Sequence, residues 1–403
     1  MRTWSDVPLP ELPGSSQPAR IVESTGSTIV PDGRARLYVC GITPYDATHL
    51  GHAFTYTCFD MLQRQWRDAG LEVTYAQNVT DIDDPLFERA AATGQDHREL
   101  AAEQIDLFRS DMEHLRVLPP DHWTAVSEVL DDLEADVRKL SLGPAYELNQ
   151  AGRTDYFLPT SPADVAGPRY RDIDLEQALR ETGEDPDLPG KSGRLDQLIW
   201  RGAKGEDFRA EGEAPGAWRP GWHIECARIA LNGLGPIIDV QGGGADLVFP
   251  HHCLSNVAMT ALEPAAEVRG QMHTGLVAYR GEKMSKSLGN LELVSRLVNK
   301  GNDPMLIRLL LIAHRWDEDW EYTEADLQVA ERRLTRWRRM RHTGGAGAAD
   351  LLDEVRDCLA DNLDTPRALA AIDAHVKDNE NRDDRAGAQL FADMCDALLG
   401  IAL

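Results

Sequence analysis

The sequence contains 403 residues, of which 42% are hydrophobic and 27% are charged, proportions typical of a globular chain of about two to four domains. Its net charge of −25 disfavours nucleic acid as the main partner. The densest apolar run, residues 309–313, is too short to span a membrane. Residues 1–17 lack the apolar segment of a secretory signal, and the six cysteines lack a disulfide spacing. We therefore expect a cytoplasmic protein that does not bind membranes.

The first recognisable unit is a strand, a helix and a second strand. Residues 36–41 predict a short buried strand that closes on a glycine turn. A helix is expected over residues 52–69, where Gly70 ends it, and a further strand over residues 72–78. This order is the βαβ unit of a parallel, Rossmann-like sheet, with ligands at the carboxyl ends of its strands.

Two later segments, residues 236–241 and 272–279, predict further strands of the same sheet. The residues between the two halves, about 115–200, lack this pattern and contain stretches rich in Pro, Gly and Asp. We expect them to form an insertion domain that splits the nucleotide-binding fold.

The chain turns helical after Tyr279. Thr323 and Asp326 resemble a capping box in front of a helical apolar pattern. Residues 342–349, with three glycines, predict a flexible linker, and residues 364–366 predict the start of a last helical region. The expected class is thus α/β, with a Rossmann-like parallel-sheet catalytic domain, an insertion domain and a C-terminal helical region.

The segment His49-Leu50-Gly51-His52 stands where the first strand's loop enters its helix. Two imidazoles beside a glycine at a helix N-terminus can approach a phosphate chain. For so short a match, two ordinary surface or core histidines are the more common explanation.

A second segment changes that balance. Lys283-Met284-Ser285-Lys286-Ser287 places two ammonium groups and two hydroxyls on one loop. Such a loop can close over a triphosphate and stabilise the charge that develops as pyrophosphate leaves. Alone it would be read as a solvated surface loop, but two phosphate-handling segments in this order on one nucleotide fold are seldom coincidental.

Together these segments resemble the two signatures of the class I aminoacyl-tRNA synthetases, which make an aminoacyl-adenylate from ATP. Four further segments are similar to cysteinyl-tRNA synthetase, and the resemblance covers about residues 36–290. They are residues 40–46 (CGITPYD), 78–84 (NVTDIDD), 221–226 (GWHIEC) and 242–252 (GGGADLVFPHH).

The resemblance implies a division of the chain into five parts. They are the first half of the catalytic domain (1–114), the insertion domain (115–200), the second half of the catalytic domain (201–275), the Lys/Ser loop with a helical stem-contact region (276–342) and the C-terminal helical region (350–403).

The cysteine branch also implies a zinc site. Cys40, Cys226 and His251 would supply two thiolates and an imidazole, leaving one position open for the thiolate of a cysteine substrate. Serine would lose that bond, so no editing step is needed. A closed zinc site or merely buried thiols are the alternatives.

Where the family has a glutamate ligand this chain has Ser255, so we expect three protein ligands. Cys253 is a conceivable substitute that we expect to point elsewhere, and His252 would support the site from behind its ligands.

The remaining roles follow from matching motif positions. His49, His52, Lys283 and Lys286 would be catalytic, and ATP would bring Mg²⁺. The substrate cysteine would contact Cys40, Thr43, Trp222 and Asp246, where Asp246 would pair with its ammonium group; for Trp222, plain core packing is the alternative. The residues expected around ATP and the adenylate are Gly41, Ile42, Thr43, Gly51, Thr55, Asn78, Val79, Thr80, Gly244, Ala245, Asp246, Val277, Ser285 and Ser287.

The acceptor of the activated cysteine separates two branches of the family. Residues 350–403 are acidic, and nothing in the chain corresponds to the anticodon-reading domain with which cysteinyl-tRNA synthetases normally continue. The segment Gly41 to His49 and the replacement by Ser255 instead resemble the shortened ligases of mycothiol biosynthesis. These form an amide between cysteine and the amine of glucosaminyl-inositol (GlcN-Ins), releasing AMP. Residues 181–186 (ETGEDP) resemble a motif of those ligases, from which Thr182 and Glu184 depart.

The resemblance therefore implies an ATP-dependent, amide-forming ligase with ATP, L-cysteine and GlcN-Ins as substrates, no nucleic acid partner, and a monomeric state. The first rival is a truncated cysteinyl-tRNA synthetase, whose best support is the group of six arginines within residues 332–341. A solvated helix face explains those arginines at least as well. The second rival is an inactive binding module, which the intact phosphate and thiol/imidazole motifs disfavour.

Overall fold

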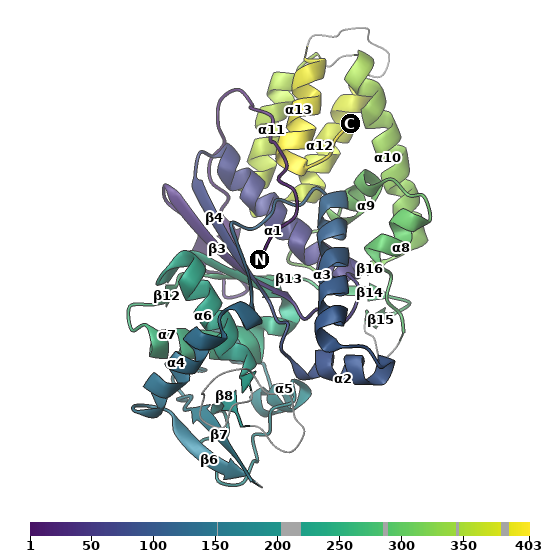
Figure 1. Ribbon diagram of the computed structural model, residues 1–403. Helices are drawn as coiled ribbons and strands as arrows, with labels where there is room; N and C mark the ends of the chain where they lie inside the picture. The colour runs from purple at the N-terminus through teal and green to yellow at the C-terminus, as the bar shows by residue number, and fades with distance from the viewer. Residues whose placement is uncertain (151, 203–218, 285–288, 344–345, 380–386) are drawn as a thin grey trace.

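A computed structural model describes residues 1–403 except for 151, 203–218, 285–288, 344–345 and 380–386. At its centre lies a five-stranded sheet in the order β13-β11-β3-β4-β5, in which every pairing is parallel. Helix α1 packs on one face and helix α6 on the other (Figure 1). The expected α/β class is confirmed. The strands are β3 (Arg34–Ile42), β4 (Glu72–Val79), β5 (His122–Ala125), β11 (Val240–Gly244) and β13 (Gln271–Thr274).

Helix α1 (Leu50–Asp68) is the crossover between β3 and β4, as the sequence predicts. Its N-cap is His49, whose Nδ1 accepts a hydrogen bond from the backbone N–H of Gly51 at 3.1 Å. Beyond its C-terminus Gly70 adopts a φ of 82°, which favours glycine and turns the chain into β4. The helix N-terminus therefore lies at the carboxyl end of β3, where ligands bind in such folds.

The side chains of β3 alternate between two apolar cores. Leu37 and Val39 pack with α1 and the C-terminal helices, whereas Tyr38 and Cys40 pack with α6 (Trp222–Leu234) on the opposite face. Successive side chains of a strand point to opposite faces, so this alternation directs Cys40 toward α6.

The carboxyl end of β3 lies unusually close to β4. The backbone N–H of Gly41 donates a hydrogen bond of 2.8 Å to Asn78 Oδ1, and the Tyr38 hydroxyl donates to the same oxygen at 3.1 Å. A Cβ atom at Gly41 would lie only 1.7 Å from the backbone oxygen of Asn78. Only glycine fits this position, and the pairing of the two strands becomes irregular between Val39 and Ile42.

Two of the predicted strands are each divided in the structure. The segment expected as one strand over residues 236–241 forms β10 (Ile237–Ile238), which pairs with β12 (Glu267–Val268), and then β11 of the central sheet. The segment 272–279 forms β13 in the central sheet and β14 (Val277–Tyr279) in a small sheet with β15 (Glu282–Lys283) and β16 (Trp320–Tyr322). In each case a short apolar run serves two sheets, which periodicity alone does not reveal.

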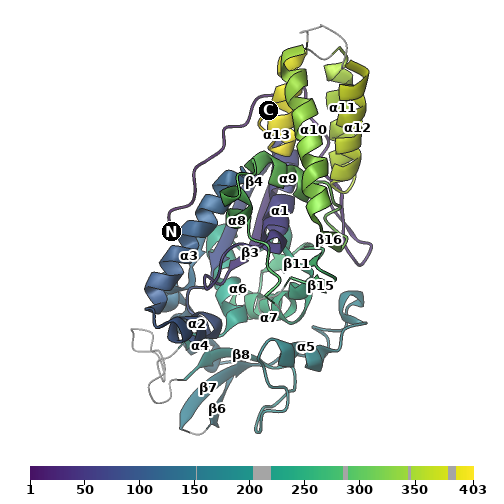
Figure 2. The same ribbon diagram turned by 90° about the vertical axis from the view of Figure 1, so that its right-hand side faces the viewer.

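The segment from β6 to β9 forms a separate antiparallel sheet in the order β6-β7-β8-β9. It lies at the opposite end of the molecule from the C-terminal helices (Figure 2). Strand β5 falls within residues 115–200 but belongs to the central sheet, so the separate sheet starts only at β6; the division into domains stays a prediction. The elements of this part are η1 (Val126–Glu128), α4 (Leu130–Ser141), β6 (Tyr146–Gln150), β7 (Arg153–Leu158), η2 (Pro168–Tyr170), α5 (Leu175–Glu181), β8 (Gln197–Arg201) and β9 (Arg219–Pro220).

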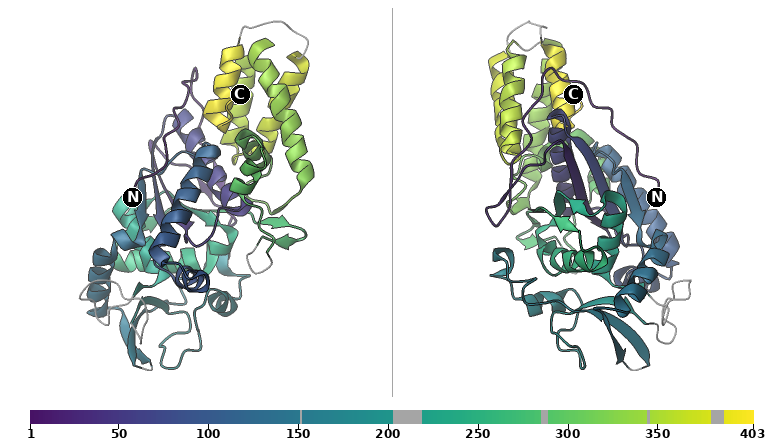
Figure 3. Two further views of the ribbon diagram at one scale, coloured as in Figure 1. Left: turned by 45° about the vertical axis from the view of Figure 1, so that its right-hand side comes forward. Right: turned by 90° about the vertical axis from the view of Figure 1, so that its left-hand side faces the viewer.

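The C-terminal helices α10 to α13 pack side by side above the central sheet (Figures 2 and 3). One half of the predicted capping box is observed, since Asp326 accepts hydrogen bonds from the backbone N–H and the hydroxyl of Thr323, whereas the Asp326 N–H donates to the backbone oxygen of Thr323. Helix α10 continues to Thr343, so the predicted linker is shorter than expected, and its residues 344–345 lie outside the described part. The helices of this region are α8 (Val294–Asn299), α9 (Pro304–Leu311), α10 (Glu324–Thr343), α11 (Ala348–Ala360), α12 (Thr365–Asn379) and α13 (Ala388–Leu399).

The remaining elements complete the layers around the sheet. They are β1 (Ile21–Val22), β2 (Thr28–Ile29), α2 (Asp84–Thr93), α3 (His97–His114), η3 (Ala245–Leu247), η4 (Val248–His252) and α7 (Cys253–Leu262). Within the described part of the chain, no helix combines the length and apolar character needed to cross a bilayer.

A fully buried ion triad joins α1 to the C-terminal helices. Asp60 of α1 accepts hydrogen bonds from Arg64 at 2.7 Å and from Arg308 of α9. Arg308 also donates to the backbone oxygen of Leu399 at the end of α13. Burial opposes ionisation of Asp60, but the two guanidinium groups hold the pKa of its carboxyl below the ordinary value. The triad thus connects the helix that carries His49 and His52 to the C-terminal region.

We predict that Asp60→Ala lowers the free energy of unfolding by about 3–5 kcal/mol, because it leaves two buried guanidinium groups without their carboxylate. Urea denaturation followed by circular dichroism measures this loss. The matched control is Glu72→Ala, which removes the exposed ion pair with Arg34 and should cost less than about 1 kcal/mol. Equal losses in the two variants would contradict the structural role of the triad.

Asp111 of α3 is another buried carboxyl, and within the described part of the chain no cation is among the groups that shift its pKa. Its side chain is buried, and neither carboxylate oxygen has a hydrogen-bond partner of good geometry among the described residues. Burial raises the pKa of Asp111 to about 7, which the nearby Thr48 hydroxyl only partly opposes. Between about pH 4 and pH 7 the folded protein therefore retains a proton that the unfolded chain releases, and stability falls as pH rises through this range.

We predict that Asp111→Asn raises the free energy of unfolding at pH 8 by about 1–3 kcal/mol, because the amide removes the cost of a buried charge. At pH 4.5 the gain should be much smaller, since the folded wild-type carboxyl is already protonated there. Urea denaturation at both pH values measures the difference. A gain of the same size at both pH values would contradict the explanation by burial of charge.

Candidate functional site

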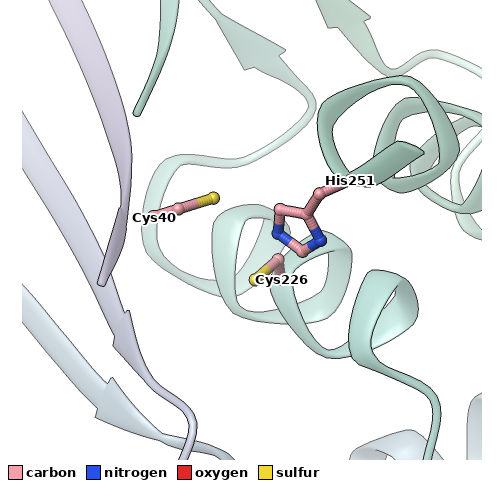
Figure 4. A group of neighbouring side chains, drawn as sticks. All are labelled: Cys40, Cys226 and His251. Carbon is pink, nitrogen blue, oxygen red and sulfur yellow. The ribbon is translucent and has the colours of Figure 1, made fainter. Parts of the chain in front are cut away.

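Three side chains from distant parts of the sequence meet beside the carboxyl end of the central sheet. Cys40 comes from β3, Cys226 from the first turns of α6, and His251 from η4. One ligand atom of each lies within 4.8 Å of those of the other two, and all three residues are buried (Figure 4). The structure therefore brings together the three residues expected to bind zinc.

The donor atoms of this cluster fit a metal ion. One ring nitrogen of His251 points toward the two sulfur atoms (Figure 4). His251 Nδ1 lies 3.0 Å from Nδ1 of His223, so the nitrogen facing the sulfurs is Nε2, which is buried and has no hydrogen-bond partner among the described residues. A buried nitrogen without a partner is costly, and coordination would satisfy it. Two cysteines and one histidine are a zinc donor set that leaves a fourth position open.

The two thiols of the cluster titrate differently. Burial and the neighbouring Cys226 raise the pKa of Cys40 well above its ordinary value. Burial would also raise the pKa of Cys226, but its hydrogen bond with Cys40 and its electrostatic interaction with the His251 imidazole hold it well below that value. Cys226 is thus the thiol that ionises first, and an ionised sulfur is the form that binds metals.

Three further side chains were considered for this site: Cys253, Ser255 and His252. Cys253 faces the backbone oxygen of Asp164, with its sulfur 3.7 Å away, in agreement with the expectation that it points elsewhere. The Ser255 hydroxyl is buried and has no hydrogen-bond partner among the described residues. His252 lies behind Cys40, with Nε2 at 3.3 Å from its sulfur and Nδ1 at 2.7 Å from Nε2 of His273.

A cavity of about 550 Å³ extends from Cys40 to the N-terminus of α1. It is large enough for a nucleotide-sized ligand. Twelve of the predicted site residues line it, namely Cys40, Gly41, Ile42, Thr43, His49, Gly51, His52, Thr55, Trp222, Gly244, Asp246 and Val277. It is completed by residues to which the sequence analysis assigned no role of their own, namely Tyr45, Asp46, Tyr56, Leu247, Gly275, Leu276, Met284 and Leu291.

At one end of the cavity the two imidazoles of the His49–His52 segment lie on the first turn of α1. Their rings stack with centroids 3.9 Å apart. The first turn contains no acidic residue that would offset the positive end of the helix dipole beside the cavity. This arrangement is suited to phosphate groups.

At the other end lie the residues expected to hold the amino acid. The indole ring of Trp222 stacks on the imidazole of His251, with centroids 3.9 Å apart and an interplanar angle of 17°. Asp246 lines the same cavity from η3. Trp222 therefore belongs to the wall of the cavity as well as to the packing around His251.

Six predicted residues whose side chains the structure describes do not line this cavity: Asn78, Val79, Thr80 and Ala245, and the zinc candidates Cys226 and His251. Asn78 instead holds the end of β3 through its hydrogen bond with Gly41, and its Nδ2 donates to Thr80 Oγ1 at 3.0 Å. The side chains of Asn78 and Thr80 thus support the loop that lines the cavity. Of the Lys/Ser loop, Ser285, Lys286, Ser287 and the side chain of Lys283 lie outside the described part of the structure.

Residues 27–332 match the family described as the class I (C) tRNA synthetase catalytic domain. The chain belongs to this family. Proteins of Thermobispora bispora, Xylanimonas cellulosilytica and Nocardia farcinica are 50%, 48% and 45% identical to it, and each comparison covers 100% of both chains. All three carry the name L-cysteine:1D-myo-inositol 2-amino-2-deoxy-alpha-D-glucopyranoside ligase.

Solved structures of the class I fold resemble the chain over most of its length. Mycobacterium tuberculosis methionyl-tRNA synthetase in complex with methionyl-adenylate aligns with a TM-score of 0.63 at 17% identity, covering 91% of this chain and 90% of that one. The leucyl-tRNA synthetase of Agrobacterium radiobacter K84 aligns with a TM-score of 0.65 at 11% identity, covering 92% and 84%. At these identities the likeness shows the shared fold.

Several polar residues around the zinc candidates received no role in the sequence analysis. His223 precedes Cys226 by three residues and contacts His251, and His273 contacts His252. The Tyr56 hydroxyl donates to the backbone oxygen of Cys40 at 3.3 Å. The position of His223 within the GWHIEC segment was a usable signal, whereas Tyr56 lies in an unremarkable stretch of helix. These residues surround the zinc candidates and complete their hydrogen bonds.

We predict that the purified protein contains about one zinc per chain and that Cys226→Ala removes most of it, because the variant loses a sulfur ligand. Inductively coupled plasma mass spectrometry of dialysed protein measures the content. Cys253→Ala is the matched control, since Cys253 is equally buried but faces Asp164, and it should retain zinc. Full zinc content in Cys226→Ala would contradict the assignment of this ligand.

Proposed function

We propose that the protein activates L-cysteine with ATP to cysteinyl-adenylate and pyrophosphate, and then joins the cysteinyl group through an amide to the amine of GlcN-Ins with release of AMP. The names of relatives that are 45–50% identical over the full chain support this reaction. We further propose that it acts as a cytoplasmic monomer, uses Mg²⁺ with ATP and has no nucleic acid partner.

The observation that carries the proposal is that one cavity joins two different binding environments. Cys40, which belongs to the cluster with Cys226 and His251, lines this cavity, and so do His49 and His52 at the N-terminus of α1. An enzyme that activates cysteine needs a thiol-selective site and a triphosphate site within one substrate length of each other. The cavity supplies this combination.

In the first step the cysteine carboxylate attacks the α-phosphorus of ATP, and pyrophosphate leaves. His49 and His52, together with Lys283 and Lys286, stabilise the negative charge that develops on the phosphates. Asp246 pairs with the ammonium group of cysteine, and Trp222 packs against the substrate. The adenine lies beside Val277, which lines the cavity.

In the second step the neutral amine of the acceptor attacks the adenylate carbonyl and expels AMP, and its proton passes to a base or to water. Bound zinc would lower the pKa of the substrate thiol and hold it as a thiolate, which serine does not provide. Cys40, Cys226 and His251 would hold that ion. Their burial excludes water from the end of the cavity where the thiol binds.

A neighbouring cavity of about 400 Å³ provides room for the acceptor. It shares Tyr45, Asp46 and Leu291 with the first cavity and is otherwise lined by Pro85, Glu88 and Arg89. Charged side chains, which form strong hydrogen bonds with hydroxyl groups, suit a sugar that carries many of them. This polar extension favours a small polyol amine as the acceptor.

The arginines of α10, which would support tRNA binding, are partly used within the fold. Arg333 pairs with Asp373 of α12 at 3.0 Å, and Arg338 pairs with Asp303 at 2.7 Å. These contacts hold α10 against its neighbours and reduce the positive charge available to a nucleic acid. The ion pairs thus disfavour a truncated cysteinyl-tRNA synthetase, and the experiment below distinguishes that alternative from the ligase.

We predict that the protein, given ATP, Mg²⁺ and cysteine, converts GlcN-Ins to its cysteinyl amide with release of AMP and leaves tRNA uncharged. Mass spectrometry of parallel reactions with GlcN-Ins and with tRNA identifies the product. His52→Ala is the matched control, and its pyrophosphate release should be slower by a factor on the order of 10². Charged tRNA without amide would establish the synthetase instead, and no adenylate in either reaction would overturn the proposal.

A further inference from the structure

We propose that Glu184, in the segment between α5 and β8, is a positioning residue that acts through His223 to keep Nε2 of His251 free of a proton and directed at the two cysteines. The inference rests on the proposed zinc site, but not on the identity of the acceptor. It concerns a residue outside the cavity, at a position where the chain departs from the motif that residues 181–186 resemble.

The geometry is a continuous chain of three polar side chains. Oε1 of Glu184 lies 2.7 Å from Nε2 of His223, and Nδ1 of His223 lies 3.0 Å from Nδ1 of His251. Nε2 of His251 is the atom that faces the sulfurs of Cys40 and Cys226 (Figure 4). The chain therefore runs from the surface of the insertion to the metal-binding end of the cavity.

When His223 is neutral, the carboxylate of Glu184 determines where the hydrogens of this chain lie. A carboxylate can only accept a hydrogen bond, so Nε2 of His223 must carry a hydrogen. In a neutral His223 the other nitrogen, Nδ1, is then an acceptor, and the hydrogen in the contact between the two imidazoles belongs to Nδ1 of His251. This leaves the lone pair of His251 Nε2 available to a metal ion.

Without the carboxylate the opposite arrangement becomes accessible. His223 could carry its hydrogen on Nδ1 and donate it to Nδ1 of His251. A neutral His251 would then carry its hydrogen on Nε2, where it would block coordination. Both residues are at most 1% exposed, so bulk water cannot easily replace the lost partner.

The surrounding packing places Glu184 where this contact is possible. Leu179 of α5 packs in a small apolar core with Phe249 and Leu254, which flank His251 in the sequence. The backbone N–H of Glu184 donates to the backbone oxygen of Leu179 at 2.9 Å, so the same core also fixes the loop. The indole ring of Trp222 stacks on the face of the His251 ring, and this contact limits the rotation of the imidazole.

The experiment compares the zinc affinity of the wild-type protein, Glu184→Ala and Glu184→Gln by competition with a chromophoric chelator. We expect a 10- to 100-fold weaker affinity for Glu184→Ala. Glu184→Gln should lose less, because its amide oxygen can accept the same hydrogen bond from His223. Glu181→Gln is the matched control, since Glu181 lies in the same segment, is exposed, and contacts Gln177 instead of His223.

A second measurement reads the proton position directly. In ¹H–¹⁵N spectra of the histidine side chains, metal-free wild-type His223 should carry its hydrogen on Nε2, and Glu184→Ala should populate the Nδ1 form. Unchanged zinc affinity and an unchanged tautomer in Glu184→Ala would overturn the proposal, even if the variant were less stable. A wild-type protein that binds no zinc would overturn the zinc site together with this inference, whatever acceptor the enzyme uses.

Discussion

The close approach of β3 and β4 at Gly41 is the constraint on which the site depends. The hydrogen bond from Gly41 to Asn78 and the absence of space for a Cβ atom bring the two strand ends together. This contact fixes the direction of the chain just after Cys40 has turned toward α6, and it turns Ile42 and Thr43 into the cavity. Metal-binding and nucleotide-binding residues thus take their positions from a few consecutive residues of one strand.

The insertion contributes to the site more than its distance from the central sheet suggests. It separates the two halves of the sheet in the sequence, yet α5 packs against η4, and Glu184 contacts His223. The buried thiols and imidazoles need such surroundings, because polar groups removed from water are stable only when their partners are fixed. The insertion and the sheet thus form one environment around His251.

Much of the fold and of the site could be predicted from the sequence. The βαβ unit has a clear pattern of apolar runs and glycine turns, and the three zinc candidates stand in recognisable motifs. The division of residues 236–241 and 272–279 between two sheets could not be predicted, because a short apolar run does not reveal its pairing partner. Likewise, the support of Asn78 to Gly41 and the contact of Glu184 with His223 are tertiary contacts that local pattern does not encode.

The insertion separates β3 from β11 in the sequence, and this separation affects how the central sheet forms during synthesis of the chain. Val240 of β11 pairs with Leu37 of β3, so the centre of the sheet stays incomplete until the whole insertion has been synthesised. Until then β3 presents an open edge, and contacts so distant in sequence form slowly. Cys40 meets Cys226 and His251 only after both have been synthesised, so the nascent chain passes through a stage at which a free thiol and an unpaired strand are exposed together.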